Sequence, residues 1–305
     1  MGGHSNRRES ALFTVEFHAM ASPCQVLLAA ASEAEARALA EPAIAEVRRI
    51  ETKYSRYRAD SVVNAINGAA GREAVPLDQE TLALLQYADQ LFELSGGLFD
   101  ITTGVLRKAW NFGEPRVPAP DELAPLLALT GWRRVQRAAD SVRLPLAGME
   151  LDFGGFGKEY AADRASAALL AQGVRSGYVN LGGDMRVLGP QPDGSPWRIG
   201  IQDPRREDRA IASIDVASGA LATSGDYERY FELDGRRYCH ILDPATGYPV
   251  SAWRSVSVLA PLTVAAGACA TIAMLKGAQA QDFLDASGNA WLAQDAAGIL
   301  HSKGL

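Results

Sequence analysis

The segment Asp152–Lys158, near the middle of the chain, has the residue types of a phosphate-binding turn. Its glycines would let the backbone approach a ligand closely, and free N–H groups at the start of a following helix attract phosphate. The spacing is not that of a Walker A loop, because Glu159 stands where Ser or Thr is needed, nor that of a dinucleotide G-x-G-x-x-G motif. The segment therefore predicts a phosphate site or, in the simpler interpretation, an ordinary turn.

Two further polar segments lie next to predicted strands. Gly182-Gly183-Asp184 directly follows one strand, and Thr223–Arg229 leads into a strand pair that turns at Asp234-Gly235. Glycine and aspartate in such positions are common in tight turns that have no ligand. These two segments gain significance only if the fold brings them to the glycine turn.

His240 and Asp100 are the remaining candidates for chemistry. His240 begins the segment His240–Gly247 and is a candidate general base, because imidazole titrates near neutral pH. Alternation would place it on one strand face with Tyr238 and Leu242, where a lone histidine is more often structural. Asp100 lies between apolar residues just past a helix end, so its carboxylate needs a metal, a ligand donor or a backbone N–H as partner.

Apolar periodicity and capping signals predict the elements that would position these residues. Ser32 and Glu35 form a capping box for a helix that runs toward Tyr54, and Pro42 is expected to kink this helix or shift its start. The other elements predicted in the first half are strands at 11–18 and 23–30, a helix through 82–92 stopped by Gly96-Gly97, an extended connection at 113–125, a hairpin-like region at 132–135 and 141–144, and a strand at 149–153 that leads through the glycine turn into a helix at 158–172.

The second half of the chain is rich in strands. The predicted elements are strands at 178–181, 197–202, 211–216, 237–242 and 254–259, a small-residue helix at 263–276, and a closing hairpin at 291–294 and 299–302. Strands and helices come in mixed blocks rather than in strict alternation. This order favours an α+β fold over a doubly wound parallel sheet.

The composition is that of a globular protein without a nucleic-acid surface. The formal net charge is −6 and hydrophobic residues make up 48% of the chain, whereas nucleic-acid binding needs clustered Lys and Arg. The three widely spaced cysteines form neither a disulfide framework nor a zinc motif. No apolar run resembles a membrane span or a secretory signal, so we expect a cytoplasmic protein with a flexible terminus at 1–10 and one domain at 11–305.

The order and spacing of the polar segments together resemble the ApbE family, the FAD:protein FMN transferases. The resemblance implies a single α+β domain of mixed sheets flanked by helices, with FAD in a cleft between subdomains. It also implies that FMN moves from FAD to a Thr or Ser hydroxyl of an acceptor flavoprotein while AMP is released. Family members are often periplasmic, which contrasts with the cytoplasmic location expected above. The matching segments are Tyr54–Tyr57 with Ser61 and Asn67, Phe99–Thr102, Asp152–Lys158, Gly182–Asp184, Trp197–Pro204, Thr223–Asp226 and His240–Gly247.

The resemblance further implies roles for individual residues. His240 matches the family's candidate general base. A backbone carbonyl near Gly155 and the hydroxyl of Thr271 match its Mg²⁺ ligands. The residues implied to bind FAD are Met20, Tyr57, Leu98, Phe99, Asp100, Asp152, Lys158 and Ile241.

Two positions depart from the family's pattern. Met20-Ala21-Ser22 stands in place of Met-Gly-Thr, and Gly267 stands where the family usually has a metal-binding Asp, four residues before Thr271. No carboxylate lies between Pro261 and Gln281, so Mg²⁺ binding is expected to be weak. This leaves two alternatives to transfer: an FAD-binding homologue without catalysis, and a Mg²⁺-dependent FAD pyrophosphatase that gives FMN and AMP.

Overall fold

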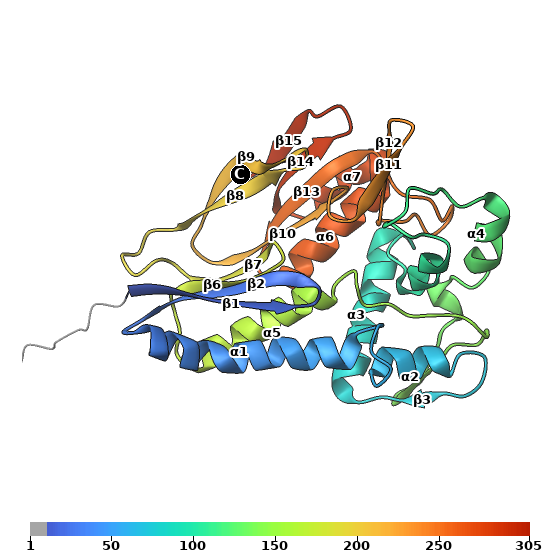
Figure 1. Ribbon diagram of the computed structural model, residues 1–305, viewed down its shortest axis with the longest axis horizontal. Helices are drawn as coiled ribbons and strands as arrows, with labels where there is room; N and C mark the ends of the chain where they lie inside the picture. Colours follow the sequence, from blue (N-terminus) through green and yellow to red (C-terminus); the bar gives the residue numbers. More distant parts are fainter. Residues whose placement is uncertain (1–10) are drawn as a thin grey trace, which may run out of the picture.

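An eight-stranded sheet runs through the centre of the molecule, with helices packed on one of its faces (Figure 1). The computed structural model describes residues 11–305, so the predicted flexible terminus, 1–10, lies outside the described residues. Each neighbouring pair of strands in this sheet is antiparallel, and the predicted α+β class is confirmed. In spatial order the strands are β1 (Ala11–Ala19), β2 (Ser22–Ala30), β6 (Gly177–Leu181), β7 (Asp184–Gly189), β10 (Gly219–Gly225), β13 (Trp253–Ala260), β14 (Ala290–Asp295) and β15 (Leu300–Lys303).

Three helices cover one face of the sheet: α1 (Glu33–Tyr54), α5 (Gly157–Ala171) and α6 (Thr263–Lys276). α1 packs along α5 below β1 and β2, and α6 lies against β10 and β13 (Figure 1). α5 and α6 also contact each other, which small buried side chains allow. The small side chains that share one apolar cluster are Ala161, Ala162 and Ala165 of α5 and Ala268 of α6. α6 continues through η3 (Gly277–Gln279) into α7 (Ala280–Ala286).

A hairpin of β8 (Trp197–Asp203) and β9 (Arg206–Val216) packs on the sheet through a separate apolar cluster. Residues of β8 are alternately buried and exposed, as expected for a strand with one buried face. The buried side chains of β8 pack with Met185 and Val187 of β7. The central sheet is therefore packed both by helices and by this hairpin.

A third region lies beyond the end of α1, on the right of Figure 1. It contains α2 (Val62–Gly68), α3 (Gln79–Ser95), η1 (Ile101–Lys108), α4 (Pro120–Leu127), η2 (Trp132–Arg134) and a small sheet of β3 (Val75–Pro76), β5 (Ser141–Arg143) and β4 (Gln136–Arg137). The hairpin of β11 (Tyr230–Leu233) and β12 (Arg236–Cys239) packs here, because Phe231 and Tyr238 stack on Trp110.

Elements with strong local signals form where they were predicted. α1 starts after Ser32, whose hydroxyl accepts a hydrogen bond from the Glu35 N–H at 3.2 Å. α3 ends at Gly96, which adopts the left-handed conformation. The predicted shift of the start of α1 at Pro42 is wrong: the helix is unbroken across this proline, which lies on its exposed side.

Four predicted elements differ from the structure. Met149–Phe153 is not a strand, because the Asn67 amide replaces a ladder partner: it accepts from the Leu151 N–H at 2.7 Å and donates to the Leu151 carbonyl at 3.0 Å. The connection 113–125 is not wholly extended, since Pro120 begins α4, a favoured place for proline. At 132–135 the chain forms η2 rather than a strand, and β12 ends at Cys239, so His240 follows the strand.

The helices within residues 11–305 include none with the length and apolar character that a membrane span requires.

Candidate active site

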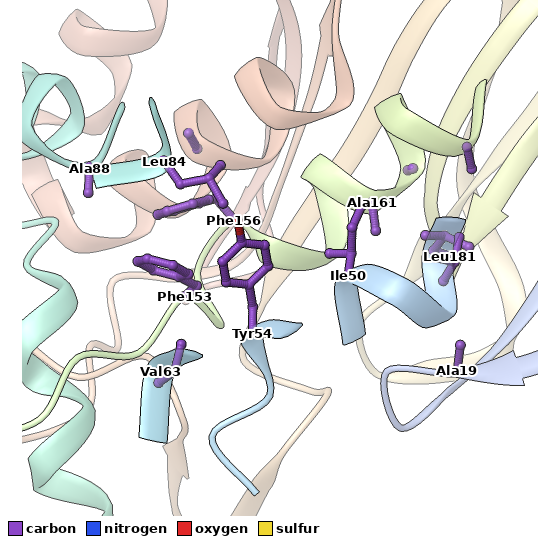
Figure 2. Packing of buried hydrophobic residues seen from close by; sticks show 14 of the residues in the cluster. Ala19, Ile50, Tyr54, Val63, Leu84, Ala88, Phe153, Phe156, Ala161 and Leu181 are labelled. Carbon is purple, nitrogen blue, oxygen red and sulfur yellow. The ribbon is translucent and has the colours of Figure 1, made fainter. Parts of the chain in front are cut away.

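Two buried aromatic side chains hold the glycine turn against the core. Phe153 and Phe156 flank Gly154-Gly155, and their ring centroids are 5.3 Å apart. The Tyr54 ring of α1 packs against Phe153 (Figure 2), and their ring centroids are 5.4 Å apart. α5 begins directly after the turn, at Gly157, whose N–H donates to the Phe153 carbonyl at 2.7 Å, so the N–H groups that the helix start offers to a ligand are those that follow, at Lys158 and Glu159. The sequence therefore builds a helix start with a rigid support and little side-chain bulk.

Asp152 ties this turn to the end of α1. Its Oδ1 accepts a hydrogen bond from the Gly154 N–H at 2.9 Å, and its Oδ2 pairs with the Arg56 guanidinium. Arg56 also donates to the Tyr57 hydroxyl at 2.8 Å and lies over the Tyr57 ring. Asp152 thus fixes both the shape of the turn and the position of a cation beside it.

Lys158 joins the turn to the second and third polar segments. Its Nζ lies 2.8 Å from Asp184 Oδ2 and 3.4 Å from the Gly182 carbonyl. Asp184 Oδ1 in turn accepts from the Thr223 N–H at 3.2 Å. Burial opposes the lysine charge, but Asp184 and then Glu159 outweigh it and raise the Lys158 pKa. The fold thus joins three segments that are far apart in the sequence.

His240 is half-buried and lies within the electrostatic influence of these cations. Its backbone N–H donates to the Arg229 carbonyl at 3.0 Å, while its side-chain Nδ1 is buried and has no hydrogen-bond partner among residues 11–305. Burial, followed by the charges of Arg229, Lys158 and Arg56, lowers the His240 pKa to about 4. The imidazole is therefore neutral at pH 7 and has a nitrogen free to accept a proton.

The other residues implied to bind FAD are spread around the turn. Phe99 is buried against it, since a Cβ atom added at Gly155 would lie 2.8 Å from the Phe99 ring. Leu98 is half-buried and Ile241 is buried. Tyr57 is 75% exposed. Met20 lies in the β1–β2 turn, where its N–H donates to Glu51 Oε1 at 2.6 Å.

Asp100 finds its partners within the protein. Its Oδ1 accepts from the Thr102 N–H at 2.8 Å and from the Thr102 hydroxyl at 2.6 Å, and its Oδ2 accepts from the Trp132 N–H at 2.9 Å. The residue is 8% exposed and caps η1. Of the partners predicted for this carboxylate, the backbone N–H is the one present. Asp100 therefore stabilises the start of η1 and its contact with η2.

The residues around the implied metal position include one acid that the sequence interpretation missed. The Thr271 hydroxyl lies 2.7 Å from the Ser224 hydroxyl. Gly267 faces Glu159, whose Oε2 is buried without a partner in the described part of the chain. Burial and then Asp184 raise the Glu159 pKa to about 8. Residues 11–305 contain no group of three or more His, Cys, Asp or Glu side chains able to hold a metal. An unpaired carboxyl oxygen is nevertheless of the ligand type that a hard cation prefers.

Comparison with known proteins agrees with this arrangement. Residues 20–292 match the sequence model of the ApbE family. The chain belongs to the ApbE family.

Curated and solved ApbE proteins resemble this chain over most of its length. The FAD:protein FMN transferase of Treponema pallidum is 36% identical over 263 residues, covering 80% of this chain and 73% of that protein. The FAD:protein FMN transferase of Vibrio cholerae is 33% identical over 254 residues, covering 78% and 76%. The crystal structure of the ApbE protein from Thermotoga maritima superposes with a TM-score of 0.88 at 34% identity, covering 96% and 97% of the two chains. The apo flavinyl transferase ApbE of Pseudomonas stutzeri gives 0.87 at 29%, covering 98% and 96%.

Sequence interpretation assigned no role to several residues of this ApbE site. Arg56 lies in the matching segment Tyr54–Tyr57, but no role was predicted for it. Its pairing with Asp152 is visible only in the structure. Ser224 and Arg229 have no sequence signal beyond the segment that contains them. Glu159 did carry a weak signal: an acid beside Lys158 in the first turn of a helix, in a chain whose position 267 is glycine.

Proposed function

We propose that this ApbE chain is an FAD:protein FMN transferase, which moves FMN from FAD to a Thr or Ser hydroxyl of an acceptor flavoprotein and releases AMP. Its relatives with this name support the proposal. The single observation that carries it is the neutral His240, whose buried Nδ1 has no partner within the described residues and whose imidazole is influenced by the charges of Lys158 and Arg56. A base beside cations is what attack of a hydroxyl on an anionic pyrophosphate requires.

The glycine turn and its cations would bind the pyrophosphate. The start of α5 offers backbone N–H groups and the positive end of the helix dipole. Lys158 and Arg56 add two charges, and each is held in place by a carboxylate, Asp184 and Asp152 respectively. These partners fix the cations before the ligand arrives, so that little ordering entropy is lost on binding.

His240 would take the proton of the acceptor hydroxyl. The hydroxyl oxygen bonds to the FMN-side phosphorus, the bond from that phosphorus to the bridging oxygen breaks, and AMP leaves with the bridging oxygen. In the free protein burial, and after it the charges of Arg229, Lys158 and Arg56, hold the His240 pKa at about 4. An anionic ligand on Lys158 and Arg56 offsets these charges, which raises the pKa toward the neutral range suited to a general base.

The implied Mg²⁺ would be held by the Thr271 hydroxyl and a backbone carbonyl near Gly155. When bound, it would neutralise the pyrophosphate charge and make the phosphorus easier to attack. Both of these ligands are neutral. The residues present fit such an ion only if an acid also faces it, and Glu159, whose Oε2 has no partner within the described residues, is the acid beside position 267.

One incubation tests the proposal. The protein is mixed with FAD, Mg²⁺ and a Thr-containing acceptor peptide, and the products are identified by mass spectrometry. We expect the peptide to gain the mass of FMN while AMP appears in equal amount. Free FMN with AMP would identify a pyrophosphatase, and FAD that is bound but intact would identify a binding protein; either result contradicts transfer.

A further inference from the structure

Glu159 projects from the first turn of α5 into the space in front of Gly267 on α6. A Cβ atom added at Gly267 would lie 2.7 Å from both Cγ and Oε1 of Glu159 and 3.0 Å from its Cδ. These distances are too short for a real Cβ atom. The Glu159 carboxyl group therefore occupies the space that a side chain at position 267 would fill.

The Glu159 carboxyl group is buried, and one of its two oxygens lacks a hydrogen-bond partner. The residue is 7% exposed, and its Oε2 has no hydrogen-bond donor within the described residues. Neighbouring acids contrast with it. Asp184 pairs with Lys158, and Asp163, one turn further along α5, accepts from the Thr263 and Val264 N–H groups at 2.9 Å each. A buried acid oxygen without a donor is costly unless a ligand completes it.

Neutral oxygens lie on the same side of α6. Thr271 follows Gly267 by four residues, so the two positions share a helical face. The Thr271 hydroxyl lies 2.7 Å from the Ser224 hydroxyl of β10. A carboxyl oxygen without a donor, with hydroxyl oxygens one helical turn along the same face, offers the oxygen ligands that Mg²⁺ and Mn²⁺ prefer, and substrate phosphates commonly supply the remaining charge.

We propose that Glu159 supplies, from α5, the acidic ligand of the divalent cation that position 267 of α6 cannot supply. The inference rests on the proposed function, since the pyrophosphate of FAD is taken as the cation's other anionic partner. It also accounts for Gly267. A glycine in a helix interior costs about 1 kcal/mol relative to alanine. In return, the missing Cβ leaves room for the Glu159 side chain.

Titration with Mn²⁺ tests the assignment, with water-proton relaxation as the readout of bound metal. The full chain is titrated with and without saturating FAD. We expect Glu159→Gln to weaken Mn²⁺ binding by about tenfold or more. Glu93→Gln, which removes an exposed glutamate of α3, is the matched control and should bind as the wild type does. Equal Mn²⁺ affinity of wild type and Glu159→Gln would overturn the inference.

A double variant keeps the test decisive if Glu159→Gln folds poorly. Glu159→Gly combined with Gly267→Asp returns the acid to α6 and removes the clash. It should bind Mn²⁺ within about threefold of the wild type. Gly267→Asp alone places a Cβ atom against Glu159, so it should lower thermal stability. A double variant that folds but does not bind Mn²⁺ contradicts the inference.

Flavin fluorescence in the same samples separates this inference from the proposed function. Absence of FAD binding by the wild type would contradict the proposed function. Normal FAD binding with Mn²⁺ affinity that is unaffected at position 159 would contradict the assignment of Glu159 alone. A wild type that binds FAD but no Mn²⁺ in either titration would also contradict that assignment.

Discussion

Two buried regions of this protein differ in whether their polar groups have hydrogen-bond partners. At the start of η1, both Asp100 oxygens accept hydrogen bonds from Thr102 and Trp132, so the protein completes the group itself. Around the start of α5, Glu159 Oε2 and His240 Nδ1 are equally buried and lack partners within residues 11–305. Burial of a polar residue therefore does not mark a site. A buried group that the protein leaves incomplete is the better indication.

The largest effect is expected from replacing His240, in the region where polar groups lack hydrogen-bond partners. His240→Ala should lower the rate of FMN transfer by about 10²–10⁴-fold, the usual effect of losing a general base. FAD affinity and the melting temperature should stay near those of the wild type, because the backbone N–H that bonds the Arg229 carbonyl remains. Transfer at the wild-type rate would show that another group takes the proton.

Acid should destabilise the same region through His240. The pKa is lowered from 6.5 to about 4 in the folded protein, so the unfolded chain binds a proton that the folded protein excludes. The His240 contribution is fully present above pH 6.5 and is lost as the pH falls toward 4, by up to about 3 kcal/mol. Denaturant unfolding of wild type and His240→Gln across this range measures it. A constant difference between the two proteins would contradict the lowered pKa.

Replacement of Asp100 tests the region at the start of η1, where the buried carboxylate has protein partners for both oxygens. Asp100→Ala removes the cap of η1 and leaves the buried Trp132 N–H without an acceptor, so the free energy of unfolding should fall by about 2–3 kcal/mol. Glu159→Gln should change this free energy by less than about 1 kcal/mol, because the lost oxygen had no protein partner. Similar losses from both variants, measured by urea denaturation, would remove the distinction between the regions.

The β1–β2 turn offers the smallest test. Met20 and Ala21 have φ angles of +52° and +57°, and left-handed backbone is unfavourable for alanine. The Met20 N–H donates a hydrogen bond to the Glu51 carboxylate. Ala21→Gly should therefore raise the free energy of unfolding by about 1 kcal/mol and leave FAD affinity unchanged. A loss of stability on thermal denaturation would show that the alanine methyl group contributes packing that outweighs its strain.

Local signals predicted much of the fold. The small-residue helix forms over Thr263–Lys276 as expected, because a glycine follows it and its residues favour helix. β10, Gly219–Gly225, was not predicted, since its small side chains carry no alternation even though it lies in the centre of the sheet. Met149–Phe153 has the alternation of a strand but pairs with a side chain instead. Strand pairing depends on partners that are far away in the sequence.

The candidate site was harder to predict than the fold. The residue types of the glycine turn and His240 can be recognised in the sequence, and the family resemblance groups them. The contacts of Lys158 with Asp184 and of Arg56 with Asp152 join distant segments, so no spacing rule reveals them. The missing acid at position 267 predicted a weakened metal site. The structure instead brings an acid from another helix to that position, which only the packing of α5 on α6 can show.

The contact between Glu159 and Gly267 also makes these two positions dependent on each other during evolution. Any side chain added at 267 while Glu159 remains would meet its carboxyl group at 2.7 Å. Loss of Glu159 while Gly267 remains would leave this face of the two helices without an acid. With the proposed role of Glu159, we expect each single replacement to weaken either packing or cation binding, and the paired replacement to preserve both. The effect of a mutation at either position depends on the residue at the other, which is epistasis arising from one van der Waals contact.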